Sequence, residues 1–340
     1  MNVEQIREIA NAVLYEGYLL YPYRHSAIKN RQRWSIGVLY PREYSEATGG
    51  VEPWTMRTEC LVTSNPDTAL DVTARFLHLL TRGAGEVVGE DARPGAIGWA
   101  PDTWQEGMER EETAAALTLG DLLRQPRRIP FAYPATRLTE PDEQRPGATI
   151  TREQSALAGS FTVAAERVES EAEVYKLTVL IANTTPLRGR IPASYNAAMP
   201  ASLISTHTIL RVRNGAFVSL LDPPERLRAA AAACHNERTY PVLVGDDGGT
   251  DTMLSSPIIL YDYPQIAPES AGALFDGTEI DEILTLRILA LTEEEKDEMR
   301  QGDARAREIL ERTEALTGEQ LMRLHGVIRG MGPPAGGGAS

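Results

Sequence analysis

Two stretches that flank a short acidic turn point most directly to the architecture: FTVAAERV at residues 161–168 and VYKLTVLIANTT at residues 174–185. Four alternate positions of the second stretch are aromatic or aliphatic: Tyr175, Leu177, Val179 and Ile181. Successive side chains of a strand point to opposite faces, so this alternation turns one apolar face toward a core. The two stretches therefore predict an antiparallel β-hairpin with one buried face.

The sequence after this hairpin predicts more strands and one helix. STHTILRVRNGAFVSLLD (205–222) continues the antiparallel sheet, with its own turn at Asn214-Gly215. Asp222 can cap a helix, because prolines and strong helix formers follow it. The short apolar runs YPVLVG (240–245) and PIILYD (257–262) then predict two buried strands. This succession is β-α-β-like.

The regions on either side are less regular. Apolar residues at helical spacing predict a helix over residues 3–15, and residues 89–120 predict a polar, acidic surface excursion with one short helix. TEPDEQRPGAT (139–149) predicts a domain boundary or a long loop. Capping-box patterns at Thr278 and Thr292 predict helices in the C-terminal region.

These patterns predict an α+β protein with an antiparallel, β-rich hairpin or half-sandwich body, a βαβ-like unit and a helical C-terminal region. The length of 340 residues fits two domains. The predicted units are an N-terminal α+β domain, a β-rich domain with one crossover helix, a group of C-terminal helices and a flexible tail. Their ranges are 1–140, 150–275, 278–329 and 330–340.

Composition excludes several classes of function. The chain has 34 Lys and Arg against 48 Asp and Glu, a net charge of −14, which disfavours nucleic acid and anionic membrane surfaces as partners. No apolar run approaches the 18 residues of a membrane span, so we expect no membrane insertion. Two distant cysteines and no signal-peptide pattern predict a cytoplasmic protein.

One segment reverses the overall charge. Residues 17–42 contain no acidic residue, and the stretch from Tyr21 to Trp34 mixes basic and aromatic side chains. Guanidinium forks and aromatic faces suit an anionic ligand or an acidic partner surface. The candidate contact residues are Arg24, His25, Lys29, Arg31, Arg33 and Trp34. Alternatively, these side chains pair with the chain's own carboxylates, for example around Glu59 or Glu279.

A second candidate site is acidic. Asp222, Asp247 and Asp262 lie at or just beyond the ends of predicted strands, and Glu279 follows downstream. Carboxylates that converge at strand ends can hold a divalent cation such as Mg²⁺ or Mn²⁺. The alternative is structural, since Asp222 can cap a helix and Asp246-Asp247-Gly-Gly is a common turn sequence. We otherwise predict no cofactor, because the usual dinucleotide, phosphate-loop, hydrolase and metalloprotease motifs are absent.

The chain also resembles a known family. The similarity lies in LYEGYLLYPYRHSAIKNRQRW (14–34), STHTILRVRNGAFVSLLDPPE (205–225) and the stretch from LSSPIILYDYPQ (254–265) to Lys296. These strings resemble bacterial proteins of unassigned biochemical role that accompany high-affinity [NiFe] hydrogenases in gene neighbourhoods. The resemblance implies a cytoplasmic accessory or assembly role for a metalloenzyme, and it assigns a role to no residue.

Two functions follow as hypotheses. The first is a non-catalytic accessory protein that binds a protein partner, a hydrogenase subunit or maturation factor, through the cationic and aromatic stretch. The second is a divalent-metal-dependent enzyme that acts on an anionic substrate at the acidic cluster.

Overall fold

The structure is a computed structural model whose described residues form one continuous body with two short outlying groups. The body comprises residues 36–86, 103–141, 148–169, 171, 173–189 and 191–264. The outlying groups comprise residues 7, 9–11, 13 and 14 and residues 293, 296, 297, 300, 307, 310, 311 and 313–315.

Ten strands of the body form a single sheet that is antiparallel at every described pairing. The strands are β1 (Thr55–Glu86), β2 (Thr103–Thr118), β3 (Arg127–Tyr133), β4 (Thr136–Pro141), β5 (Ala148–Gln154), β6 (Leu157–Arg167), β7 (Val174–Asn183), β8 (Ile204–Val218), β9 (Tyr240–Leu243) and β10 (Thr252–Ser256). The helical elements are α2 (Arg42–Ala47), α3 (Leu119–Arg124), α4 (Tyr195–Ala198), η2 (Met199–Ala201), η3 (Glu225–Leu227) and α5 (Arg228–Ala232). The predicted antiparallel, β-rich body is confirmed.

The predicted hairpin is β6 and β7. Their register runs from Gly159 opposite Asn183 to Arg167 opposite Tyr175. The alternate residues of β7 that were predicted to face inward are buried: Tyr175, Leu177, Val179 and Ile181. Their burial supplies the apolar face on which the rest of the sheet closes.

The long strand β1 organises the sheet. Its first half lies between β7 and β8, and its second half lies between β2 on one side and β8, then β5, on the other. The register with β8 shifts between Ser64 and Ala69, opposite Asn214, whose φ is +59°. Asn214-Gly215 was predicted to be a hairpin turn, and this prediction is wrong. Asn214 instead adopts the left-handed conformation within an irregularity of one continuous strand.

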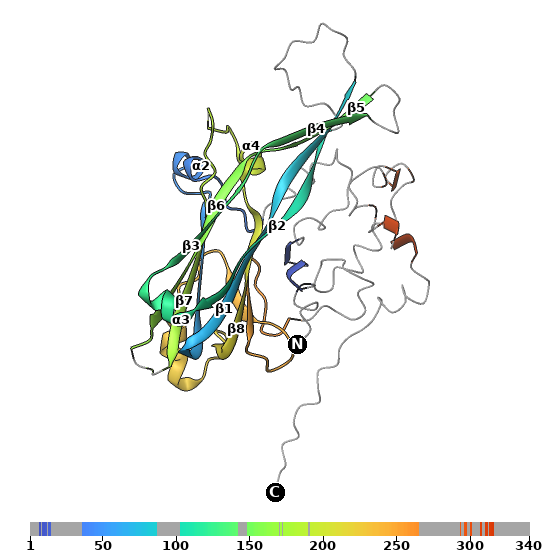
Figure 1. The fold of residues 1–340 in the computed structure, drawn as a ribbon. Helices are drawn as coiled ribbons and strands as arrows, with labels where there is room; N and C mark the ends of the chain where they lie inside the picture. The colour runs from blue at the N-terminus through green and yellow to red at the C-terminus, as the bar shows by residue number, and fades with distance from the viewer. Residues whose placement is uncertain are drawn as a thin grey trace.

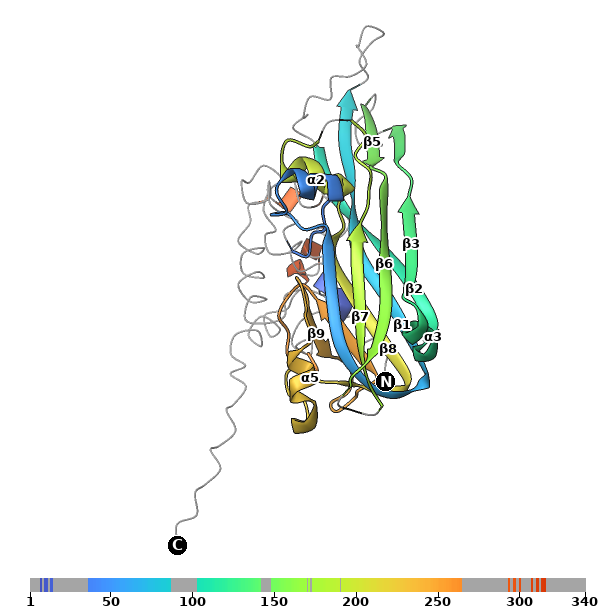
Figure 2. The same cartoon turned by 90° about the vertical axis from the view of Figure 1, so that its left-hand side faces the viewer.

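The sheet curls around its core, as Figures 1 and 2 show. In the strand order, β6 and β7 separate β3 from β1. Even so, the rings of Phe76 on β1 and Phe131 on β3 have centroids only 5.3 Å apart. Leu119 and Leu122 of α3 join the same buried cluster. Because α3 connects β2 to β3, its burial holds these two strands near one another at the edge of the curl.

The segment predicted to be an acidic surface excursion is in large part a strand. Residues 103–118 form β2, which pairs with β1 from Ala69 to Gly83. Basic residues of β1 offset the acidic ones of β2: Arg75 lies 3.5 Å from Glu109, and Arg82 lies 3.9 Å from Glu106. Cross-strand pairs of opposite charge stabilise an acidic strand within a sheet, and the periodicity of the sequence does not reveal these pairs. The short helix expected within this excursion is not found at residues 103–118; α3 begins at Leu119, where the predicted excursion ends.

The region after β8 differs in detail from the prediction. β9 lies where YPVLVG predicted it, but residues 257–262 are not a strand, and Thr252–Ser256 form β10 instead. Pro257 lacks the N–H that a ladder requires, and Ile259 and Tyr261 are 73% and 83% exposed. The predicted helix is present as η3 and α5, but it begins at Glu225 after Pro224, and Asp222 is not its cap.

The connections from β8 to β9 and from β4 to β5 can be compared with the predicted βαβ-like unit and the predicted break. β8, the helical segment and β9 follow one another as the βαβ-like pattern requires, but β10 lies between β8 and β9 and is antiparallel to both. β4 and β5, on either side of residues 142–147, pair with each other, and β1 also pairs with β5, β7 and β8. The break predicted at residues 139–149 therefore connects two neighbouring strands of one sheet.

The outlying residues are helical where they are described. Ile9, Ala10 and Val13 are buried against Val242 and Leu254, on the side of the sheet opposite the main core, as the predicted N-terminal helix requires. Described residues from 293 to 314 are also helical. The rest of the predicted C-terminal helices and the tail at 330–340 lie outside the described residues and stay predictions. No helix of the described part has the length and apolar character to cross a membrane.

Candidate functional site

The predicted cationic and aromatic contact residues lie outside the described part of the chain. They are Arg24, His25, Lys29, Arg31, Arg33 and Trp34. Their alternative partner Glu59 can be placed. It is fully buried, and both of its carboxylate oxygens already have partners among the described residues. Glu59 is therefore not a free acid for that stretch, and the contact surface stays a prediction.

The predicted metal ligands form no group of three in the described part, although Ser219 Oγ links Asp262 to the main-chain N–H of Asp222. Asp222 and Asp247 are exposed, and Glu279 lies outside the described residues. Asp262 has both oxygens occupied: one accepts a hydrogen bond from Ser219 Oγ at 2.5 Å, and the other accepts one from the Leu243 N–H at 2.8 Å. The described residues contain no group of three or more metal-ligating side chains. Here Asp262 ties the segment after β10 to the ends of β8 and β9.

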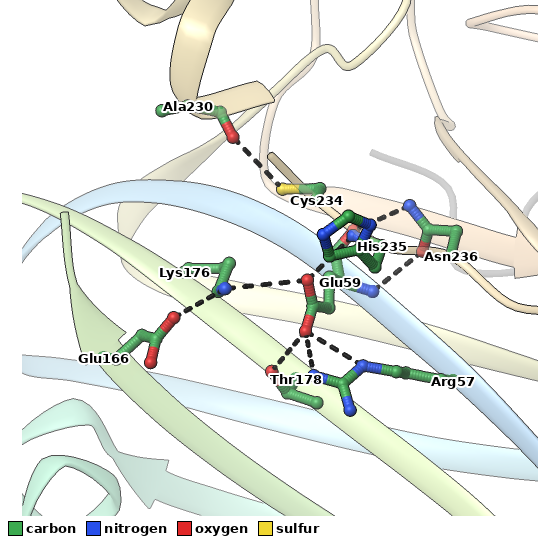
Figure 3. A network of polar contacts seen from close by, with 9 residues as sticks. All are labelled: Arg57, Glu59, Glu166, Lys176, Thr178, Ala230, Cys234, His235 and Asn236. Carbon is green, nitrogen blue, oxygen red and sulfur yellow. Dashed lines mark hydrogen bonds and ion pairs between the residues drawn. The ribbon is translucent and has the colours of Figure 1, made fainter. Parts of the chain in front are cut away.

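A buried network centred on Glu59 joins β1 to the segment after α5 (Figure 3). One carboxylate oxygen accepts from Arg57 Nε at 2.9 Å, and the other accepts from the main-chain N–H of His235 at 2.8 Å and lies 3.6 Å from Lys176 Nζ. The Asn236 side chain binds both the N–H and the C=O of Glu59, at 2.8 and 3.1 Å. The acid thus pins a segment without regular structure onto the sheet.

The contacts of this network stabilise the ionised forms of Glu59 and Lys176. Burial raises the pKa of Glu59, but the His235 N–H, Arg57 and Lys176 outweigh it, and the net pKa lies below the ordinary value. The pKa of Lys176 is raised, chiefly by its hydrogen bond to Glu166 at 2.6 Å. A carboxylate that is ionised at neutral pH and surrounded by donors is poorly suited to take up a proton. We therefore assign the Glu59 network a structural role.

The two thiols, Cys60 and Cys234, lie near this network, and their raised pKa values make them unreactive. Cys60 is fully buried, and burial raises its pKa. Burial and the nearby charge of Glu59 raise the pKa of Cys234 to about 11. The thiolate is both the nucleophile and the metal ligand, so both groups are protonated and weakly reactive at neutral pH.

A different cluster lies where β2 and β3 face one another across the edge of the curl. We call it the seam cluster: His78 of β1, Arg110 and Glu112 of β2, Tyr133 of β3 and Gln154 of β5. The Arg110 guanidinium stacks on the Tyr133 ring, 4.3 Å from its centroid, and donates to Gln154 Oε1 at 2.9 Å. The Tyr133 hydroxyl donates to Glu112 Oε1 at 2.5 Å. These side chains bridge β2 and β3, which share no main-chain pairing among the described strands.

The seam cluster is incompletely paired. His78 is fully buried, and neither of its ring nitrogens has a hydrogen-bond partner in the described chain. Burial and the charge of Arg110 lower its pKa to about 4; the Ser155 main chain opposes this shift without meeting hydrogen-bond geometry. Arg110 Nε is also buried without an acceptor. Such groups are uncommon in folded proteins and call for a bound partner or water.

The opposite face of β1 carries a third polar group, under the N-terminal helix. Arg75 donates to Asn11 Oδ1 at 2.8 Å and lies 3.4 Å from Glu111. His207, opposite Arg75 in the register, has its Nδ1 2.8 Å from the Ser205 carbonyl. Burial and Arg75 lower the pKa of His207 to about 3. This group anchors the helix to the sheet.

Sequence patterns did not point to the seam cluster. Its five members come from four strands that are far apart in the chain, and each one is an ordinary residue of its own strand. Only the curl of the sheet brings Tyr133 over Arg110 and His78. The Glu59 network had one local signal, the Arg57-x-Glu59 spacing, which places both side chains on the same face of one strand.

Comparisons with known proteins add no relative: no protein-family model and no curated protein matches this chain.

Proposed function

We propose that this protein is a non-catalytic accessory or assembly protein that binds a protein partner. The family resemblance suggests a [NiFe] hydrogenase or its maturation machinery as that partner. The observation that best supports partner binding is a projecting arm of the sheet, formed by β4, β5 and the adjoining ends of β1 and β2 (Figure 1).

The arm is exposed on both faces at its outer strand. Thr136, Arg137, Leu138 and Thr139 of β4 are all exposed, and Leu138 keeps 57% of its surface in water. A strand that buries neither face gains little from the hydrophobic effect within its own chain. Burial of such a strand against a partner would supply that gain.

The edge of the arm suits strand pairing. β4 pairs with β5 on one side, and no main-chain hydrogen bond joins its other side to a described residue. Unpaired N–H and C=O groups of an edge strand are a common docking site for an extended segment of another protein. Arg137 is held by Glu153 at 3.0 Å, which leaves Leu138 as the apolar centre of this edge.

Co-purification with two matched variants tests this function. In the native host, the tagged protein should recover a hydrogenase subunit or maturation factor. Leu138→Asp should reduce that recovery about tenfold or more, as expected for a charge placed at the centre of an interface. Val51→Asp is the control, because Val51 is 74% exposed and lies outside the arm. The proposal fails if the wild type reproducibly recovers no partner, or if Leu138→Asp recovers as much as Val51→Asp.

The cationic and aromatic stretch at residues 21–34 remains part of the proposed contact surface. Charge reversal at Arg31 should then weaken recovery of the same partner, whereas equal recovery would confine the contact to the arm.

A further inference from the structure

We propose that the seam cluster is a binding site for a single carboxylate group, held by the Arg110 guanidinium and the His78 imidazole. This inference goes beyond the proposed function and does not depend on it.

The first support is a guanidinium that makes no ion pair with a described residue. The partners of Arg110 among the described residues are neutral: the Gln154 amide oxygen and the face of the Tyr133 ring. Its Nε is buried with no acceptor. Arg110 is partly buried, and leaving its buried Nε without an acceptor is unfavourable. A carboxylate is the group whose two oxygens match the forked donors of a guanidinium.

The second support is the imidazole beside it. His78 is fully buried and has one N–H donor and one acceptor nitrogen, both without partners in the described chain. Its ring lies 6.1 Å from the Tyr133 ring, centroid to centroid, on the same aromatic side chain that Arg110 covers. The imidazole therefore offers a further donor next to the unpaired guanidinium.

The strand register makes the site converge. Arg110 of β2 lies opposite Phe76 of β1, and Gln154 of β5 lies opposite Leu80 of β1. Phe76, His78 and Leu80 alternate on one face of β1, so these neighbours share the concave face of the sheet. Unpaired donors from two strands thus meet at one place, which scattered surface residues would not do.

The charges of the cluster limit the ligand to a monoanion. Glu112 lies two residues from Arg110 on the same face of β2, and its carboxylate is turned to the Tyr133 hydroxyl. With a neutral imidazole, the cluster holds one positive and one negative charge. A second negative charge on the ligand would be repelled by Glu112. A carboxylate therefore fits better than a phosphate dianion.

Titration with acetate at pH 7, followed by thermal denaturation, tests the site. The midpoint temperature should rise and saturate with acetate, and it should not do so with acetamide or with the dianion sulfate at equal ionic strength. Arg110→Gln should weaken acetate binding about 10- to 100-fold, the usual effect of losing a hydrogen bond to a charged group. Arg124→Gln, an exposed arginine of α3 that pairs with Asp121, should leave the binding unchanged.

A second measurement needs no variant. Saturation transfer from the aromatic protons of the wild-type protein should reach the acetate methyl group, and formate should suppress it. The proposal is overturned if the signal transferred to acetate does not level off as the acetate concentration rises. It is overturned as well if acetamide receives the same transfer as acetate. It is also overturned if Arg110→Gln folds and binds acetate as the wild type does.

The source of the carboxylate is distinguished by a short peptide and its C-terminal amide. Tighter binding of the free peptide than of acetate assigns the site to a chain end of another protein, and equal binding assigns it to small carboxylates. Binding of the amide as tightly as the free peptide overturns carboxylate recognition altogether.

Discussion

The Glu59 network and the seam cluster are polar groups buried on opposite faces of the same sheet, and they differ in how completely they are paired. Each carboxylate oxygen of Glu59 has a donor, and two cations flank it. Arg110 and His78 keep buried nitrogens without partners in the described chain. A fully paired network stabilises a fold, whereas an incompletely paired one costs stability and is retained where it serves a function. We therefore expect the Glu59 network to stabilise the fold and the seam cluster to serve a function.

The largest effect is expected at Glu59. Glu59→Leu removes the acid but leaves Arg57, Lys176 and the His235 N–H without their acceptor, so the free energy of unfolding should fall by roughly 3–5 kcal/mol. Urea denaturation measures this change. The control is Glu46→Leu, which breaks an exposed pair with Arg42 and should cost about 1 kcal/mol or less. Similar losses in both variants would contradict the structural role of the Glu59 network.

An intermediate effect is expected from pH. The pKa of His78 is lowered to about 4 from 6.5, so the unfolded chain binds a proton first as the pH falls. Stability is complete above pH 6.5 and should decrease by roughly 2 kcal/mol between pH 6.5 and 4.5 on account of this residue. The lowered pKa of Glu59 acts later, because its contribution is lost only as the pH falls below about 4.5.

Two histidine variants check this order. Denaturation midpoints of His78→Gln, measured across the same pH range, should show a flatter profile than the wild type. His235→Gln is the matched control, because the His235 side chain is exposed and only its main chain contacts Glu59. An unchanged slope in His78→Gln would show that the seam histidine does not contribute, and would assign the loss to other buried groups such as His207, whose pKa is lowered to about 3.

The smallest effect is expected at Arg110. Arg110→Met keeps an apolar stem on Tyr133 and removes a charge that has no ion-pair partner among the described residues. The free energy of unfolding should change by about 1 kcal/mol or less in urea denaturation. A loss as large as that of Glu59→Leu would place Arg110 among the structural groups and erase the contrast between the two regions.

Local patterns predicted the hairpin and most strand types but not every boundary. The alternation in β7 identified its buried face, and the length and apolar character of YPVLVG identified β9. The acidic segment at residues 103–118 was not recognised as a strand, because its partners Arg75 and Arg82 lie on another strand. Asn214 suggested a turn, since its preference for the left-handed conformation is the same in a turn and in a strand irregularity.

The candidate sites depended more strongly on structure. The sequence grouped Asp222, Asp247 and Asp262 by their positions after strands, whereas Asp262 is occupied by Ser219 and the Leu243 N–H. The seam cluster had no sequence signal, because its side chains become neighbours only when β3 curls back over β1 and β2.

The antiparallel, β-rich character of the body and the inward face of the β6–β7 hairpin could be predicted from the chain alone, because both follow from the alternation of side chains along single strands. Which charges are neutralised and which are left unpaired became visible only in the folded protein. Those pairings join strands that are distant in the chain, and they depend on register and curl, which no local pattern encodes.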